Sequence, residues 1–130
     1  MDALDSRLSA CLPLAHRLCR ALRDEAACAG LADDALPPGD ASDARFHLER
    51  DPAMGTESLV GEWLDRRGHR VGMLLFHADG SFFAEHDIVR AHPSDPEVFI
   101  EAVEACGRGE RIVCGLRSMP MCGAGQPAPG

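Results

Sequence analysis

The chain has 130 residues, 45% of them hydrophobic, and a formal net charge of -8 at pH 7, which suits one domain with a single core. The acidic balance argues against nucleic acid as a partner, because proteins that bind the phosphate backbone carry an excess of Arg and Lys. No apolar run approaches the roughly 20 residues that a membrane-spanning helix requires, and the acidic start is unlike a secretory signal. We therefore expect a cytoplasmic protein that binds neither nucleic acid nor membranes.

The N-terminal residues 1–31 predict an amphipathic helix that packs on a sheet, because apolar residues recur there at steps of three and four. These residues are Leu4, Leu8, Cys11, Leu12, Ala15, Leu18, Cys19 and Leu22. Pro13 removes a backbone donor, so the helix either bends there or restarts near it. Residues 32–44 are acidic, contain Pro37-Pro38-Gly39 and lack periodicity, which is typical of a loop.

Three apolar segments after this loop alternate with a period of two and predict an antiparallel meander. Residues 59–64 and 71–77 flank a polar turn, and residues 82–89 return through Asp79-Gly80, a strong hairpin signal. A shorter alternation at 45–49 predicts a peripheral strand.

Residues 94–107 predict a second helix. Ser94 and Glu97 have the spacing of a capping box, Pro96 suits a first helical turn, and Gly107 suits a C-terminal cap. Residues 111–117 then predict a final strand on the same sheet, and residues 118–130 a disordered tail. The expected fold class is therefore α+β, an N-terminal amphipathic helix, a meander, one capped helix and a last strand, with residues 45–117 as the core of a single domain spanning 1–117.

If Asp79-Gly80 forms a two-residue turn, His77 lies opposite Phe82 and the two faces of the meander are defined. The face expected to form the main core carries Val60, Leu64, Val71, Met73, Leu75, Phe82, Ala84 and Ile88. The opposite face carries Leu59, Gly61, Trp63, Gly72, Leu74, Phe76 and Phe83, followed by Glu85 and Asp87. That second face is too apolar to remain exposed to solvent, so we expect either the N-terminal helix or a second copy of the chain to cover it. A homodimer is the partner this interpretation favours.

A shallow ligand-binding area is predicted around Trp63, Gly72, Glu85 and Asp87. The ring of Trp63 would lie over the bare backbone of Gly72, which simple packing also explains. The two carboxylates could do acid-base work, although alternating acids on a half-exposed strand are common.

The turn between the first two meander strands carries Arg66, Arg67 and Arg70, which could bind an anion or an acidic partner, or could merely be solvated. His77 and His86 are the histidines in well-predicted strands, and they form the alternative candidate for a metal site or a small enzyme. No third ligand converges on them, so no metal or cofactor is predicted.

The six cysteines lack the close spacing of a zinc site, and a reducing compartment disfavours disulfides. They are Cys11, Cys19, Cys28, Cys106, Cys114 and Cys122. We expect reduced thiols that act as small apolar filler, with Cys122 as an exposed thiol in the tail.

The run Gly61-Glu62-Trp63-Leu64-Asp65, together with residues 74–85, resembles a small family of uncharacterised bacterial proteins known mainly as structural-genomics targets. The resemblance covers roughly residues 55 to 117. It implies a compact α+β domain and transfers no activity, cofactor or catalytic residue.

With no motif that carries a mechanism, the chain is best interpreted as a small binding or protein-interaction module without catalytic activity. The alternative is a small enzyme or metal-binding protein that uses His77 and His86, or the carboxylates of Glu85 and Asp87.

Overall fold

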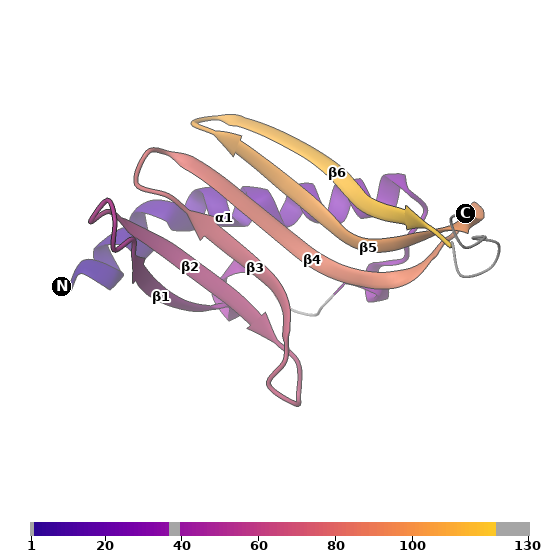
Figure 1. The fold of residues 1–130 in the computed structure, drawn as a ribbon, viewed down its shortest axis with the longest axis horizontal. Helices are drawn as coiled ribbons and strands as arrows, with labels where there is room; N and C mark the ends of the chain where they lie inside the picture. The colour runs from indigo at the N-terminus through magenta and orange to yellow at the C-terminus, as the bar shows by residue number, and fades with distance from the viewer. Residues whose placement is uncertain (1, 37–39, 122–130) are drawn as a thin grey trace, which may run out of the picture.

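A computed structural model describes residues 2–36 and 40–121. One long helix packs against one face of a six-stranded antiparallel sheet whose strands follow chain order, β1-β2-β3-β4-β5-β6 (Figure 1). The elements are α1 (Ala3–Cys28), the 3-10 turns η1 (Asp33–Ala35) and η2 (Ala41–Asp43), and the strands β1 (Arg45–Arg50), β2 (Glu57–Leu64), β3 (Arg70–Phe76), β4 (Ser81–His92), β5 (Asp95–Arg108) and β6 (Arg111–Pro120). The predicted α+β class is confirmed.

Helix α1 begins where the carboxylate of Asp2 accepts a hydrogen bond from the backbone N–H of Asp5, at 2.8 Å. It continues through Pro13 as one element, which excludes the restart, one of the two alternatives that the sequence left open. Its buried residues are Ala15, Leu18, Cys19, Leu22 and Ala26. The first four belong to the predicted stripe, whose N-terminal members Leu4, Leu8, Cys11 and Leu12 are only partly buried. No helix in the described part of the chain is long and apolar enough to cross a membrane.

The core lies between α1 and the sheet face that it covers. Leu18 and Leu22 from the helix and Leu59, Leu74 and Val103 from the sheet are fully buried there. In Figure 1 α1 crosses behind the sheet, and the described chain places no helix in front of it. The opposite face is called the open face below.

The predicted helix at 94–107 is wrong, because these residues form strand β5. β5 pairs with β4 along one side and with β6 along the other, so both sets of its backbone groups are satisfied by neighbouring strands. The apparent helix start belongs to the β4–β5 turn, where the backbone N–H of Ser94 donates to Nδ1 of His92 at 3.1 Å and the carboxylate of Asp95 accepts from the N–H of Glu97 at 3.2 Å. Long ladders with two partners outweigh a local helix signal.

The final strand also differs in extent, since β6 continues to Pro120 instead of ending at Arg117. The expected loop at 32–44 contains the turns η1 and η2. Residues 37–39 and 122–130, which include most of the predicted tail and Cys122, lie outside the described residues.

The register between β3 and β4 corrects the predicted faces. Phe76 pairs with Phe82 and Gly72 with His86, one residue away from the predicted alignment. The turn is a three-residue loop closed by the N–H of His77 donating to the carbonyl of Ser81 at 2.9 Å, with Gly80 at φ +89°. A one-residue slip reverses every side chain of a strand, so Phe82 and Ala84 lie under α1 while Phe83 and Glu85 lie on the open face.

The register between β2 and β3 agrees with the prediction over most of its length. Val60 pairs with Leu75 and Glu62 with Met73, but a bulge after Trp63 places Leu64 opposite Arg70 instead of Val71. The side of the meander that was expected to be the main core, marked by Val60, is the open face, and α1 covers the side with Leu59, Trp63 and Leu74.

Candidate functional site

A hollow among the described residues lies where β3 and β4 separate, and we call it the β3–β4 cavity. Its volume is about 520 Å³. The lining residues are Ala35, Leu36, Trp63, Leu64, Asp65, Arg66, Val71, Asp87, Ile88 and Val89. Most of them are aliphatic, and the charged groups are two carboxylates and one guanidinium.

The cavity exists because the ladder between β3 and β4 stops early. The last pair is Gly72 with His86, and the β4–β5 register shifts between Asp87 and Arg90. Within that irregular segment Val89 has φ +55°, a left-handed conformation that a β-branched residue rarely adopts. Val89 is 65% exposed and lines the cavity.

Asp87 is the carboxylate of the cavity that has no hydrogen bond or ion pair within the described chain. Partial burial raises the pKa of Asp87 above its ordinary value, and the neighbouring charge of Glu85 raises it further. The other carboxylate, Asp65, is already engaged, because one of its oxygens accepts from the backbone N–H groups of Arg67 and His69 at 2.8 and 2.9 Å.

Beneath the cavity, Trp63 and His86 pack against each other with ring centroids 4.6 Å apart. The indole N–H of Trp63 donates to the carbonyl of Asp40 at 2.9 Å, which anchors the ring to η2. His86 is 1% exposed and neither ring nitrogen has a hydrogen-bond partner. Burial lowers the pKa of His86 to about 4, so the imidazole is neutral at physiological pH.

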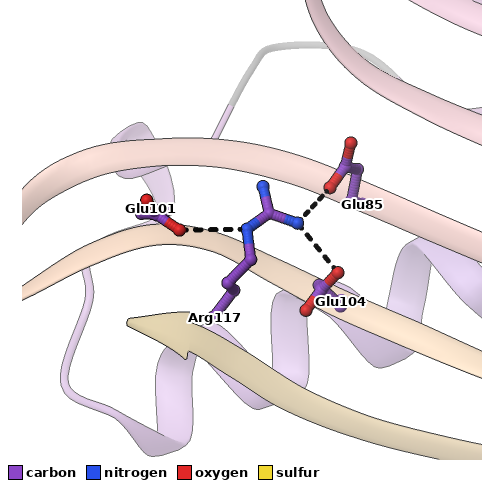
Figure 2. A network of polar contacts seen from close by, with 4 residues as sticks. All are labelled: Glu85, Glu101, Glu104 and Arg117. Carbon is purple, nitrogen blue, oxygen red and sulfur yellow. Dashed lines mark hydrogen bonds and ion pairs between the residues drawn. The ribbon is translucent and has the colours of Figure 1, made fainter. Parts of the chain in front are cut away.

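A charged network occupies the open face beside Asp87 (Figure 2). Arg117 donates to Glu85 and Glu104 at 2.9 Å each and to Glu101 at 3.2 Å. The hydrogen bond to Glu85 is the main reason why the pKa of Arg117 is raised. One cation thus balances three carboxylates, and the network keeps a net negative charge.

The predicted ligand-binding area is divided between the two faces of the sheet. Trp63 and Gly72 pair on the face under α1, whereas Glu85 and Asp87 lie on the open face. The prediction that all four share one face is therefore wrong, because it depended on the slipped β3–β4 register. A Cβ at Gly72 would lie 2.9 Å from Cε3 of Trp63 and 2.8 Å from the carbonyl oxygen of Glu85, so the glycine accommodates close packing. Only Trp63 and Asp87 of this set reach the β3–β4 cavity.

The basic turn keeps its predicted position at the β2–β3 connection. Arg66, Arg67 and Arg70 are exposed, and Arg66 lines the cavity. Their binding role stays a prediction.

The two candidate histidines occupy unlike environments. His77 lies in the exposed β3–β4 turn, with Nδ1 3.0 Å from Oγ of Ser58, beside a second hollow of about 500 Å³. His86 is sealed under α1. Across residues 2–36 and 40–121, no three His, Cys, Asp or Glu side chains are grouped so as to hold a metal ion.

Sequence reasoning missed Arg117 and Val89. The sequence predicts a strand that ends at Arg117 and a helix before it, and this arrangement gives no reason to connect Arg117 with Glu85. Val89 carries no sequence signal for a positive φ, since glycine and asparagine are the residues that normally indicate one.

Comparison with models of protein families, with curated proteins and with solved structures found no match. The class that the fold defines is an α+β domain with one helix against an antiparallel six-stranded meander.

Proposed function

We propose that the protein is a non-catalytic interaction module that pairs with a second copy of itself through the open face. The observation that carries this proposal is an apolar row that crosses five neighbouring strands of the open face. It consists of Val60, Leu75, Phe83, Cys106 and Val113, which are aligned by the strand register. Val113 is 62% exposed, and apolar rows flanked by polar residues are typical of interfaces.

The charges on either side of the apolar row favour a second copy as the occupant. On one side β1 contributes Arg45 and β5 contributes Glu104, two residues from the row. On the other side the same strands contribute Glu49 and Arg108, again two residues away. A twofold axis along the row therefore places Arg45 over Glu49 of the second copy and Glu104 over Arg108 of the second copy. Such electrostatic complementarity fixes the register of a symmetric interface.

An axis parallel to the strands is disfavoured by the same charges. It would bring the row that holds Glu62, Glu85 and Glu104 against the same row of the second copy. Like charges facing each other across an interface are destabilising. The expected dimer therefore packs two sheets face to face about the apolar row.

The chemistry of the histidines and thiols supports a cytoplasmic module without catalysis. His86 has no access to substrate under α1, and Glu85 is held by Arg117. The five cysteines within the described residues are free thiols, which suits a reducing compartment.

Val113→Asp tests the interface, because Val113 is exposed in the single chain and the proposed twofold axis along the row would bring the new carboxylate against its own symmetry mate. We expect wild-type protein to sediment as a dimer in analytical ultracentrifugation and the variant to dissociate at least tenfold more readily. Met54→Asp is the matched control, since Met54 is 74% exposed on the β1–β2 connection. A monomeric wild type at all concentrations would overturn the proposal.

A charge exchange on β1 tests the orientation of the two copies. Arg45→Glu alone should weaken the dimer, and Arg45→Glu combined with Glu49→Arg should restore it, because the pair is then reversed on both sides. If the double variant is weaker than the single one, the axis does not lie along the apolar row.

A further inference from the structure

The β3–β4 cavity has the dimensions and walls of a small-molecule site. Its volume of about 520 Å³ lies within the range of about 300–1,000 Å³ that is usual for such sites. Leu36, Leu64, Val71, Ile88 and Val89 give it aliphatic walls. A ligand that fills it must therefore present a mostly apolar body.

The charged groups that line the cavity determine which charge the polar end of that ligand must carry. Asp65 is satisfied by its own turn, and Arg66 lies on the exposed connection. Asp87 remains, a half-buried carboxylate without a hydrogen bond or ion pair in the described chain, on the strand that also carries Glu85. Arg117 and Arg70 offset part of the charge of Asp87, but the pKa of its carboxyl stays raised. A cation would compensate the remaining negative charge of Asp87, whereas an anion would be repelled by it.

The strained conformation of Val89 places the site at an irregular part of the sheet. Asp87 and Val89 lie in the segment where the β4–β5 register shifts. Irregular strands of this kind redirect side chains and occur often beside binding sites. Here the irregularity brings a side chain of the open face to the same cavity as Trp63, which belongs to the covered face.

We propose that the β3–β4 cavity binds small organic cations, an aliphatic or aromatic amine whose apolar body fills the cavity and whose ammonium group pairs with Asp87. This proposal is independent of the dimer, because Val71 and Asp87 of the cavity lie four residues along their strands from Leu75 and Phe83 of the apolar row. The ammonium would donate hydrogen bonds to the carboxylate in a partly desolvated setting, where charge-assisted bonds are strong.

Three probes with one apolar body test the proposal: phenylbutylamine, phenylbutanol and phenylbutanoate. Binding is followed by isothermal titration calorimetry and by the fluorescence of Trp63, the single tryptophan of the chain. We expect the amine to bind at least ten times more tightly than the carboxylate, with the alcohol between them. Equal affinities, or no binding of the amine by either method, would overturn the proposal.

Asp87→Asn tests the role of the carboxylate while it preserves the size of the side chain. The preference for the amine over the alcohol should disappear in this variant, and Asp24→Asn, on the exposed side of α1, should keep it. A preference that persists in Asp87→Asn would show that Asp87 is not the partner of the ammonium. Val71→Phe should weaken all three probes by filling the cavity, and unchanged affinities would place the probes elsewhere.

The same titrations in Val113→Asp separate this site from the dimer. If the dimer proposal fails, amine binding should be unaffected. Amine binding that is lost together with the dimer would contradict an independent site in the β3–β4 cavity.

Discussion

At the scale of single residues, His86 is the group whose burial has the clearest thermodynamic consequence. Its pKa is about 4 in the folded chain and about 6.5 in an unfolded one. Arg23 from α1 adds a smaller electrostatic effect of the same sign. Between these pH values the imidazole of His86 is therefore protonated in the unfolded chain and neutral in the folded chain.

This difference predicts a pH dependence of stability. The free energy of unfolding should fall by about 3 kcal/mol as the pH decreases from about 7.5 to 4, and the contribution of His86 to the slope should vanish above about pH 7.5. Chemical denaturation of His86→Leu across this range should lack that part of the slope. His77→Gln serves as the control because His77 lies in an exposed turn, and its profile should match the wild type. A slope that is unchanged in His86→Leu would contradict the burial of a neutral imidazole.

The prediction of site residues from the sequence was limited because the pairing register of the strands was not known. Trp63 and Asp87 were identified as candidates, and both line the cavity. Gly72 and Glu85, which were predicted to share their site, do not line the cavity. Side chains of a strand alternate between two faces, and the length of the preceding turn determines which face each side chain occupies. The role of Arg117 required knowledge that β5 lies between it and Glu85.

At the scale of elements, β5 shows how the surroundings decide a conformation. Val98, Phe99, Ala102 and Val103 fit a helical stripe as well as a strand, and the local cap signal favoured the helix. In the structure Val103 lies on the covered face and Ala102 lies on the open face, and neither residue has any exposed surface. Consecutive side chains on opposite faces of one segment are typical of a strand.

The β5–β6 hairpin offers a test with two glycines. A methyl group at Gly107 would overlap the backbone carbonyl oxygen of Arg111, whereas a methyl group at Gly115 meets nothing within 4 Å. Gly107→Ala should therefore cost about 1–3 kcal/mol of unfolding free energy, and Gly115→Ala should be neutral or slightly stabilising. Thermal denaturation in the Val113→Asp background measures both without a contribution from the dimer. Equal effects of the two substitutions would argue against the close β5–β6 approach at Gly107.

At the scale of the whole molecule, helix and sheet share one core and should unfold together. Leu22 is fully buried between them. Leu22→Ala should lower the free energy of unfolding by about 2–5 kcal/mol, and the far-ultraviolet and Trp63 fluorescence transitions should move together. Arg20→Ala, on the exposed side of α1, should leave both in place. A fluorescence transition that stays fixed while the helix melts earlier would indicate two independent units.

The sequence by itself determined the amphipathic helix, the meander strands, the last strand and the α+β class, because each depends on a repeat of three to four or of two residues along the chain. Only the tertiary structure decided that β5 is a strand, that α1 covers the face with Leu59 and Trp63, and that β3 and β4 separate to form a cavity. These features depend on contacts between segments distant in sequence and on a turn that is one residue longer than its Asp-Gly signal indicates. A local pattern identifies an element, but the partner strands determine which face is buried.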